Sequence, residues 1–169
     1  MRYFSLFPKT TVEIENKQVS MVDISTRFKL LDYIKNNNET LIKLDYTIEE
    51  EKRPEQVSYE LYNSYNYTWI LLTLNNVYNV YEDWVLPQSV IDKRLIKKYG
   101  SIRNAMREVF AWYDENGYEV SPNSRNKKTK KTVFQKVMEE NEKRKHIKIF
   151  TNISIQRIQN DFQAILKEL

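Results

Sequence analysis

The amino-acid sequence predicts an α+β protein with a small strand–helix–helix–strand module at residues 39–92. Side chains alternate in character over residues 41–48, which is the period of a β-strand. Pro54 stands where the first turn of a helix tolerates proline, because the missing N–H has no helical partner there. A second helical pattern covers residues 69–74, and an irregular aromatic segment then returns to Pro87. This order of elements predicts the fold class.

An N-terminal arm and a short helix are predicted at residues 1–38. Residues 3–8 are apolar and aromatic without a helical period, which favours an extended arm. Alternating side chains on both sides of residues 15–18 indicate a hairpin, although its turn lacks an Asn-Gly pair. A helical pattern follows over residues 24–34, and a cluster of asparagines ends it.

A C-terminal α+β extension is predicted at residues 93–169. In chain order, the patterns indicate a helix over residues 89–99, a short helix and a hairpin within 102–120, a basic loop at 121–132, a strand at 147–150 and an amphipathic helix at 152–169. The apolar residues of the last helix fall on one stripe, so this helix needs a surface to cover it.

The composition excludes several classes of protein. Hydrophobic residues make up 41% of the chain and charged residues 30%, which is typical of a folded globular protein. The 2 glycines cannot form a Gly-rich loop for a phosphate, and the lack of cysteine excludes disulfides and Cys-based zinc sites. His146 lies beside lysines and is expected at the surface. Without a leader-like apolar segment or a run of about 20 apolar residues, we expect the chain in the cytoplasm or inside a larger particle assembled there.

The positive charge is concentrated at the C-terminal end. Residues 1–124 carry 15 basic and 18 acidic side chains, whereas residues 125–169 carry 12 basic and 5 acidic ones. The most basic segment is residues 125–131, and its simplest interpretation is a solvated loop. Two alternatives stay open. The first is a loop that becomes ordered when it binds an acidic protein, and the second is a nucleic-acid site. The second lacks an interleaved aromatic residue for base stacking.

The carboxylates do not form a recognisable catalytic or metal-binding pattern. Glu49–Glu51 and Glu82-Asp83 are the candidate acid/base groups, but a run of glutamates in a loop is usually solvated. The spacing of an EF-hand is absent. The sequence therefore predicts no catalytic residue, no cofactor and no metal site.

The order of elements in the central module is similar to a LysM module, a small βααβ domain that binds peptidoglycan. The Gly-Asp-Thr-Leu-like run that usually precedes the first helix is replaced here by Glu-Glu-Glu-Lys-Arg-Pro at residues 49–54. A peptidoglycan-binding LysM-type module is therefore the alternative function.

Five segments spread over nearly the whole chain resemble one phage family. They are RYFSLFP at Arg2–Pro8, RPEQVSYELYNSYNYTWILLTLNN at Arg53–Asn76, DW at Asp83-Trp84, KYGS at Lys98–Ser101 and NEKRKHIKIF at Asn141–Phe150. Together they resemble the T-even-type tail baseplate wedge proteins of the gene product 53 family. The family commonly has glycine where this chain has Asn63, and asparagine tolerates the left-handed backbone that a helix end often needs.

This resemblance implies a non-enzymatic structural protein of the virion, with a LysM-like core. It implies a place in the wedge of a contractile tail baseplate, in multiple copies and assembled in the host cytoplasm. The expected partners are other wedge proteins and tail proteins near the central hub, with no membrane and no nucleic acid.

Two sets of residues are expected to carry these roles. The residues expected to fix the core module and its interface are Arg53, Pro54, Tyr59, Tyr62, Trp69, Asp83 and Trp84. Within this set, Trp69 should anchor the helix pair, and Asp83 should cap the chain or pair with Arg53. The residues expected to contact partners in the assembly are Tyr3, Phe4, Phe7, Ile155, Ile158, Phe162, Ile165 and Leu169. The alternative for this second set is packing on the protein's own core.

Overall fold

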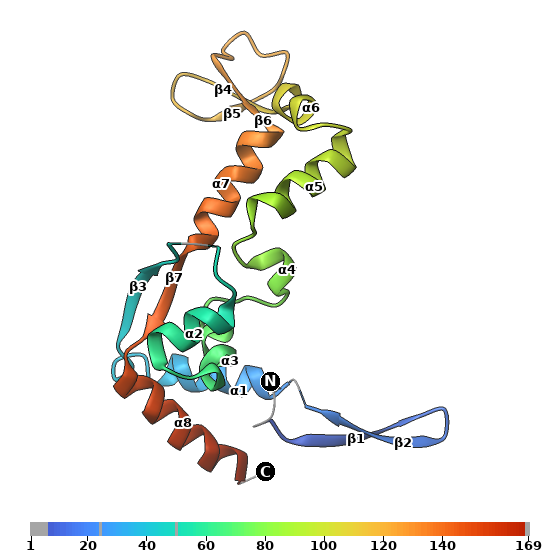
Figure 1. The fold of residues 1–169 in the computed structure, drawn as a ribbon. Helices are drawn as coiled ribbons and strands as arrows, with labels where there is room; N and C mark the ends of the chain where they lie inside the picture. The colour runs from blue at the N-terminus through green and yellow to red at the C-terminus, as the bar shows by residue number, and fades with distance from the viewer. Residues whose placement is uncertain (1–6, 24, 50, 168–169) are drawn as a thin grey trace. The chain divides into compact units, whose positions relative to one another are not determined.

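The computed structural model describes residues 7–23, 25–49 and 51–167 of the 169-residue chain. About half of the chain is helical, at 50%, and 21% is strand, which confirms the predicted α+β class (Figure 1). The residues fall into two compact units. Unit 1 comprises Met1–Asp83 and His146–Leu169, and unit 2 comprises Trp84–Lys145. No helix in the described parts of the chain is both long and apolar enough to cross a membrane.

The described elements of each unit follow in chain order. Unit 1 contains β1 (Lys9–Ile14), β2 (Lys17–Val22), α1 (Thr26–Asn36), β3 (Lys43–Thr47), α2 (Pro54–Tyr62), a 3-10 turn η1 (Tyr65–Tyr67), α3 (Thr68–Leu74), α4 (Val80–Asp83), β7 (His146–Phe150) and α8 (Asn152–Lys167). Unit 2 contains α5 (Gln88–Tyr99), α6 (Ile102–Arg107), β4 (Val109–Tyr113), β5 (Glu119–Val120), β6 (Thr129–Thr132) and α7 (Val133–Lys145).

The predicted N-terminal hairpin is confirmed by the antiparallel pairing of β1 with β2. Its two turn residues, Glu15 and Asn16, both have positive φ, at 50° and 60°. A two-residue turn of this kind matches the right-handed twist of the strands, which explains how the hairpin forms without an Asn-Gly pair. The Asp23 N–H donates to the Pro8 carbonyl at 2.8 Å and closes the base of the hairpin.

The second strand of the central module lies much later in the chain than the sequence predicts. β3 pairs antiparallel with β7, so that Leu44 lies opposite Ile149 and Tyr46 lies opposite Ile147. The C-terminal extension predicted at residues 93–169 is thus divided between the two units, because its last strand and helix belong to unit 1. The boundaries predicted at residues 38 and 92, and the likeness to a LysM module, stay predictions.

A turn explains why residues 77–87 do not form the returning strand. The Asp83 carboxylate accepts the backbone N–H groups of Tyr78 and Asn79 at 2.9 and 2.8 Å. These two N–H groups are therefore not available to pair with a neighbouring strand. The single-turn helix α4 follows directly after them. Trp84 follows directly and is buried, as are the next two residues.

The core of unit 1 gathers residues from both of its chain segments. Its members are Phe7, Leu30, Ile34, Leu41, Trp69, Ile70, Phe150, Ile155, Ile158 and Phe162. Trp69 lies at its centre, with ring centroids 5.5 Å from Phe7 and 5.3 Å from Phe162. The core therefore forms only when α8 has returned to the helix pair α2 and α3.

Unit 2 contains a helix that the sequence analysis does not predict. The basic loop expected at residues 121–132 ends in strand β6, and α7 follows at once. β6 joins β4 and β5 in a three-stranded antiparallel sheet, in the order β5-β4-β6. The apolar stripe of α7 is short and is followed by the polar Asn141 and by charged residues. Its helical period is therefore difficult to recognise in the sequence.

Asn141 has a definite role in spite of its burial. Its side-chain Oδ1 accepts the Leu86 N–H at 2.8 Å, and its Nδ2 donates to the Leu86 carbonyl at 3.0 Å. A buried amide that satisfies both groups of a backbone residue avoids the cost of unpaired polar atoms. The pair ties the start of unit 2 to its last helix.

Replacement of Trp69 tests the core of unit 1. We expect Trp69→Ala to lower the free energy of unfolding by about 3–5 kcal/mol, because a large buried side chain is lost and a cavity is left. Ile153 is 78% exposed on α8 of the same unit, so Ile153→Ala is the matched control and should change stability by no more than about 0.5 kcal/mol. Chemical denaturation measures both. Equal stability of Trp69→Ala and the parent chain would contradict the anchoring role.

Candidate assembly surfaces

Strand β7 is satisfied along both edges, although only one edge faces another strand. One edge pairs with β3, and on the other the Asn75 side chain accepts the Lys148 N–H at 2.7 Å and donates to the Lys148 carbonyl at 2.8 Å. Two residues on, the Tyr62 hydroxyl accepts the Phe150 N–H at 3.2 Å and donates to its carbonyl at 3.0 Å. Because backbone groups alternate in direction along a strand, the N–H and carbonyl groups of Lys148 and Phe150 point away from β3. The Asn75 and Tyr62 side chains therefore form the hydrogen bonds that a third strand would otherwise form with β7.

Sequence reasoning does not identify Asn75 or Asn141. Both asparagines pair with the N–H and the carbonyl of one distant residue, Lys148 and Leu86 respectively. In a sequence, Asn75 looks like the residue that ends a helix, and Asn141 looks like part of a charged run. The one sequence signal that could identify these two asparagines is that each lies next to a predicted strand or core segment.

Arg53 and Pro54 begin helix α2 as the sequence predicts. Arg53 is the N-cap residue, and its backbone N–H donates to Gln56 Oε1 at 2.8 Å. Pro54 is buried at the first helical position. At the other end, Asn63 has φ 51° and its N–H donates to the Tyr59 carbonyl at 2.7 Å. Asparagine thus accommodates the left-handed helix end that the sequence analysis expects there.

The predicted aromatic residues of the module occupy different environments. Tyr59 is 47% exposed and stacks on Tyr65 with ring centroids 4.7 Å apart. Tyr62 is half-buried and meets Tyr67 edge to face at 5.8 Å. Burial raises the pKa of the Tyr62 hydroxyl to about 12. Tyr62 therefore belongs to the inner framework, whereas Tyr59 lies at the surface.

Asp83 and Trp84 lie at the boundary between the two chain segments that define the units. The Asp83 carboxylate accepts two backbone N–H groups of the turn before α4, and the role predicted for Asp83 in the module stays a prediction. Trp84 is 2% exposed and begins unit 2. The structure thus assigns Trp84 to a different unit from Trp69.

Four of the eight residues predicted to contact partners are buried within this chain. Phe7, Ile155, Ile158 and Phe162 all lie in the core of unit 1, so the alternative of packing on the protein's own core applies to them. Tyr3, Phe4 and Leu169 lie outside the described residues, as does the side chain of Ile165. Helix α8 is also held by hydrogen bonds from Tyr33 to Asp161 at 2.6 Å and from Tyr67 to Gln159 at 2.8 Å.

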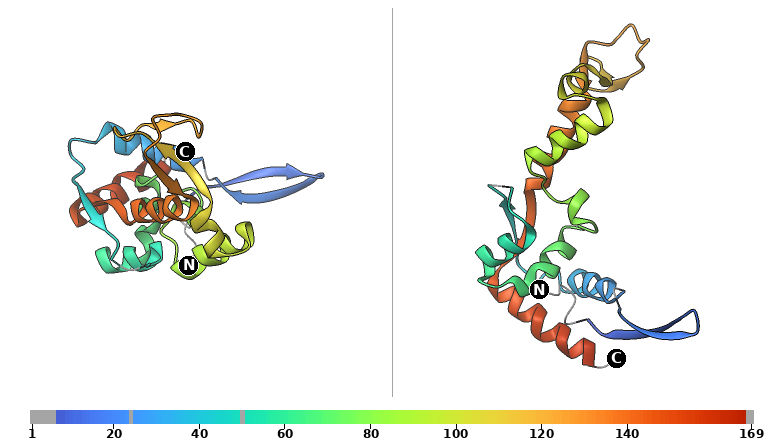
Figure 2. Two further views of the ribbon diagram at one scale, coloured as in Figure 1. Left: turned by 90° about the horizontal axis from the view of Figure 1, so that it is seen from above. Right: turned by 45° about the vertical axis from the view of Figure 1, so that its right-hand side comes forward.

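The β1–β2 hairpin offers an apolar surface that nothing described in unit 1 covers. Every residue of the two strands except Val22 is exposed, and Figure 2 shows the dark-blue ribbon with no other described element of unit 1 on its faces. Val12 lies opposite Val19, and cross-strand partners share a face. Ile14 and Met21 lie on this same face by the alternation of a strand. These four side chains, 39–48% exposed, form the hairpin face.

Unit 2 brings basic side chains and aromatic rings together, which the sequence analysis does not foresee. Lys127, Lys131 and Lys136 lie over the rings of Trp112, Tyr113 and Phe110 at 4.9, 5.4 and 3.7 Å. All three rings come from β4, and the two lysines of the predicted loop reach them because the loop returns as β6 beside that strand. The loop and these aromatic residues lie apart in the sequence, so their contact becomes visible only from the pairing of β6 with β4.

The described residues contain no group of three or more acidic, histidine or cysteine side chains that could hold a metal ion. The pKa of Glu60 lies below its ordinary value because the side chain of Lys52 hydrogen-bonds to it at 2.8 Å. The pKa of Lys131 is raised by its hydrogen bond to Glu139. Both are surface ion pairs, and neither provides a group poised for proton transfer.

Comparison with known proteins identifies similar phage proteins. A family model described as "Base plate wedge protein 53" matches residues 2–145. The chain is also 25% identical over 178 aligned positions to the "Baseplate wedge protein gp53" of Enterobacteria phage T4. That alignment covers 94% of this chain and 90% of the phage T4 protein.

The two side chains along the outer edge of β7 should protect different amides from exchange. In Asn75→Ala, we expect faster hydrogen exchange at the Lys148 amide, because its acceptor is lost. In Tyr62→Phe, the Phe150 amide should exchange faster instead. Amide exchange followed by NMR measures both, with the Ile147 and Ile149 amides, which face β3, as internal controls. Equal acceleration of all four amides in both variants would contradict this assignment.

Tyr62 should also make the protein lose stability at alkaline pH. Its pKa is raised from 10.0 to about 12 in the folded protein, so its contribution is complete below pH 10 and is lost as the pH rises through about 12. We therefore expect Tyr62→Phe to show a smaller loss of stability between these pH values than the parent chain. Denaturation at a series of pH values measures the loss, and the absorbance of tyrosinate follows ionisation. An unchanged alkaline loss in the variant would contradict the effect of burial.

Proposed function

This chain belongs to the family of phage base plate wedge protein 53, and from that premise we propose that it joins neighbouring wedge proteins near the central hub of the baseplate. It is a structural component of the baseplate wedge in a contractile phage tail, and hence of the virion. Its family implies contact with other baseplate proteins. The identity of those neighbours near the hub, and the presence of multiple copies, are part of the proposal.

A purely structural role without catalysis is also part of the proposal. It is supported by the family, whose members are named as wedge proteins. The alternative function, a peptidoglycan-binding LysM-type module, receives no support from the comparisons.

The hairpin face is the observation that carries the proposed joining role. A two-stranded hairpin alone is only marginally stable in water, and exposed apolar patches of this kind mark interaction sites. The hairpin carries two basic residues, Lys9 and Lys17, and two acidic ones, Glu13 and Glu15, so its net charge is zero. A ribbon with zero net charge and one apolar face fits an apolar surface of another wedge protein, because that surface would bury the face and supply the second layer that the two-stranded sheet lacks.

Polar replacement of the hairpin face should prevent assembly without unfolding the protein. We expect Val12→Thr combined with Val19→Thr to reduce incorporation into tails at least about tenfold, because each loses apolar contact while threonine keeps the strand propensity of valine. The measurement is the amount of this protein in tails purified from cells in which a plasmid supplies the variant to a phage that lacks the gene.

The opposite face of the same hairpin provides the matched control. Thr11 lies across from Ser20, and Thr11→Ser with Ser20→Thr exchanges two polar residues there. This control should enter tails normally, and both variants should unfold at the temperature of the parent chain. Normal incorporation of the Val12→Thr, Val19→Thr variant would contradict the role of the hairpin face. Absence of the parent protein from purified tails would contradict the proposed function itself.

A further inference from the structure

The two units of the chain carry opposite net charges. Unit 2 has 15 basic and 8 acidic side chains, a net charge of +7, whereas unit 1 has 12 basic and 15 acidic ones, a net charge of −3. Within unit 2, residues 121–131 contain five basic side chains and no acidic one. The proposed joining role does not account for this concentration of charge.

The backbone of the basic loop is restrained by hydrogen bonds within the loop and to strand β4. Its Lys128 N–H donates to the Tyr113 carbonyl at 2.8 Å, and the Lys127 ammonium donates to the Pro122 carbonyl at 2.7 Å. The Ser124 N–H donates to the Ser121 carbonyl at 2.9 Å. These bonds restrain the backbone of the loop, so less backbone entropy is lost when a partner binds to it.

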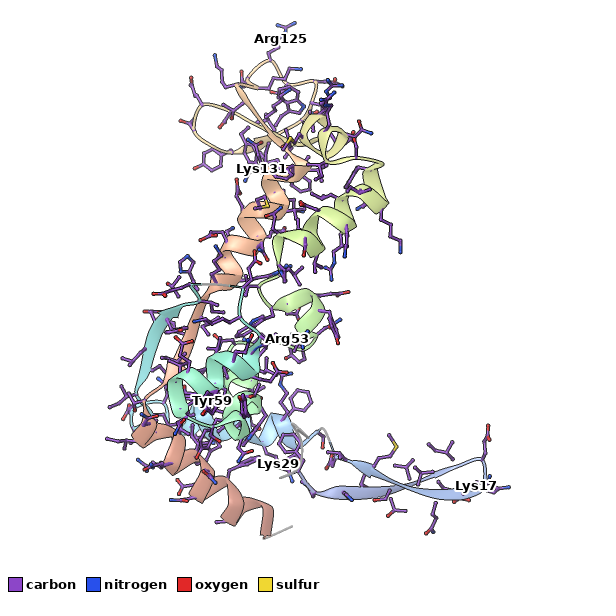
Figure 3. The ribbon with its side chains drawn as sticks, in the orientation of Figure 1. Lys17, Lys29, Arg53, Tyr59, Arg125 and Lys131 are labelled. Carbon is purple, nitrogen blue, oxygen red and sulfur yellow. The ribbon has the colours of Figure 1, made fainter. Side chains whose placement is uncertain are left out.

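The basic side chains of the loop divide into two groups. Lys127 and Lys131 lie over aromatic rings of β4, and Lys131 is also 2.6 Å from Glu139. Arg125, Lys128 and Lys130 are exposed, and Figure 3 shows Arg125 pointing away from the sheet. We call these three residues the cationic surface.

We propose that the cationic surface docks onto an acidic surface of another baseplate protein. This inference rests on the proposed function and names the chemistry of one partner. Complementary charges speed association and fix the relative orientation of two proteins, even where each ion pair contributes little affinity. Such a contact suits a part that must enter a large assembly in one orientation.

The aromatic residues beside the loop favour a protein over a nucleic acid as the partner. Proteins that bind single strands use open aromatic faces on which bases stack. Here lysines of the same chain occupy a face of Trp112, Tyr113 and Phe110.

Reversal of the three charges tests the inference in assembled tails. The test variant combines Arg125→Glu, Lys128→Glu and Lys130→Glu, and the charge-conserving variant combines Arg125→Lys, Lys128→Arg and Lys130→Arg. The control variant combines Lys29→Glu, Lys93→Glu and Lys97→Glu, which reverses the same number of exposed charges on α1 and α5. We expect at least about a tenfold loss from purified tails for the test variant only. Thermal unfolding should be unchanged in all three, because the altered side chains are exposed.

Chemical cross-linking identifies the chemistry of the partner directly. A carbodiimide joins a lysine amine to a carboxylate that touches it, with loss of water. In purified tails, we expect peptides containing Lys128 or Lys130 to be joined to an aspartate or glutamate of a different tail protein. Mass spectrometry of the digested, cross-linked tails measures this.

The possible outcomes separate this inference from the proposed function. If the parent protein is present in tails and the test variant enters equally well, the inference is wrong and the proposed function stands. Cross-links only to a second copy of this chain, or no cross-link of Lys128 and Lys130 in tails that contain the protein, would also overturn it. Binding of a single-stranded DNA oligonucleotide at about 0.15 M salt that is lost in the test variant would replace the acidic protein with a nucleic acid.

Discussion

The structure of unit 1 depends on how the outer edge of β7 is satisfied. A two-stranded sheet leaves unpaired backbone groups on both outer edges, and such groups are costly when they are shielded from water. On β7 the Asn75 amide and the Tyr62 hydroxyl take these groups. These bonds fix the helix pair α2 and α3 against a strand that arrives some 73–88 residues later. The core around Trp69 can close only on that framework.

In unit 2, too, a side chain pairs with the backbone N–H and carbonyl of a residue that is distant in the sequence, where the two ends of the unit meet. Leu86 is near the beginning of the unit and Asn141 near its end, and one side-chain amide pairs with both backbone groups of Leu86. Side-chain amides can imitate a strand at a single residue, which gives a definite register without a further strand. A segment whose two ends are tied together in this way can be inserted into another chain segment, because its ends lie close to each other.

Elements with a strong local period could be predicted from the sequence, and the pairings between distant segments could not. The hairpin, the strand at β3 and the terminal helix follow from alternation or from an apolar stripe, which are local properties. The partner of β3 could not be found in this way, because residues 77–87 were expected to return beside it and the strand at 147–150 was assigned to the C-terminal extension. Burial of Phe162 and Ile158 within the chain was one of two open alternatives, because an apolar stripe does not say which surface covers it. Asn75 and Asn141 act through distant backbone groups that no local pattern shows.

The position of β7 in the chain has a consequence for the order of synthesis. The Asp45–Lys148 ion pair joins residues that are 103 positions apart, and all of unit 2 lies between them. A ribosome therefore releases the complete unit 2 before it releases the strand and helix that complete unit 1. Contacts within unit 2 can form early, whereas α2 and α3 must wait with their apolar faces uncovered. The part of the protein that is begun first is finished last.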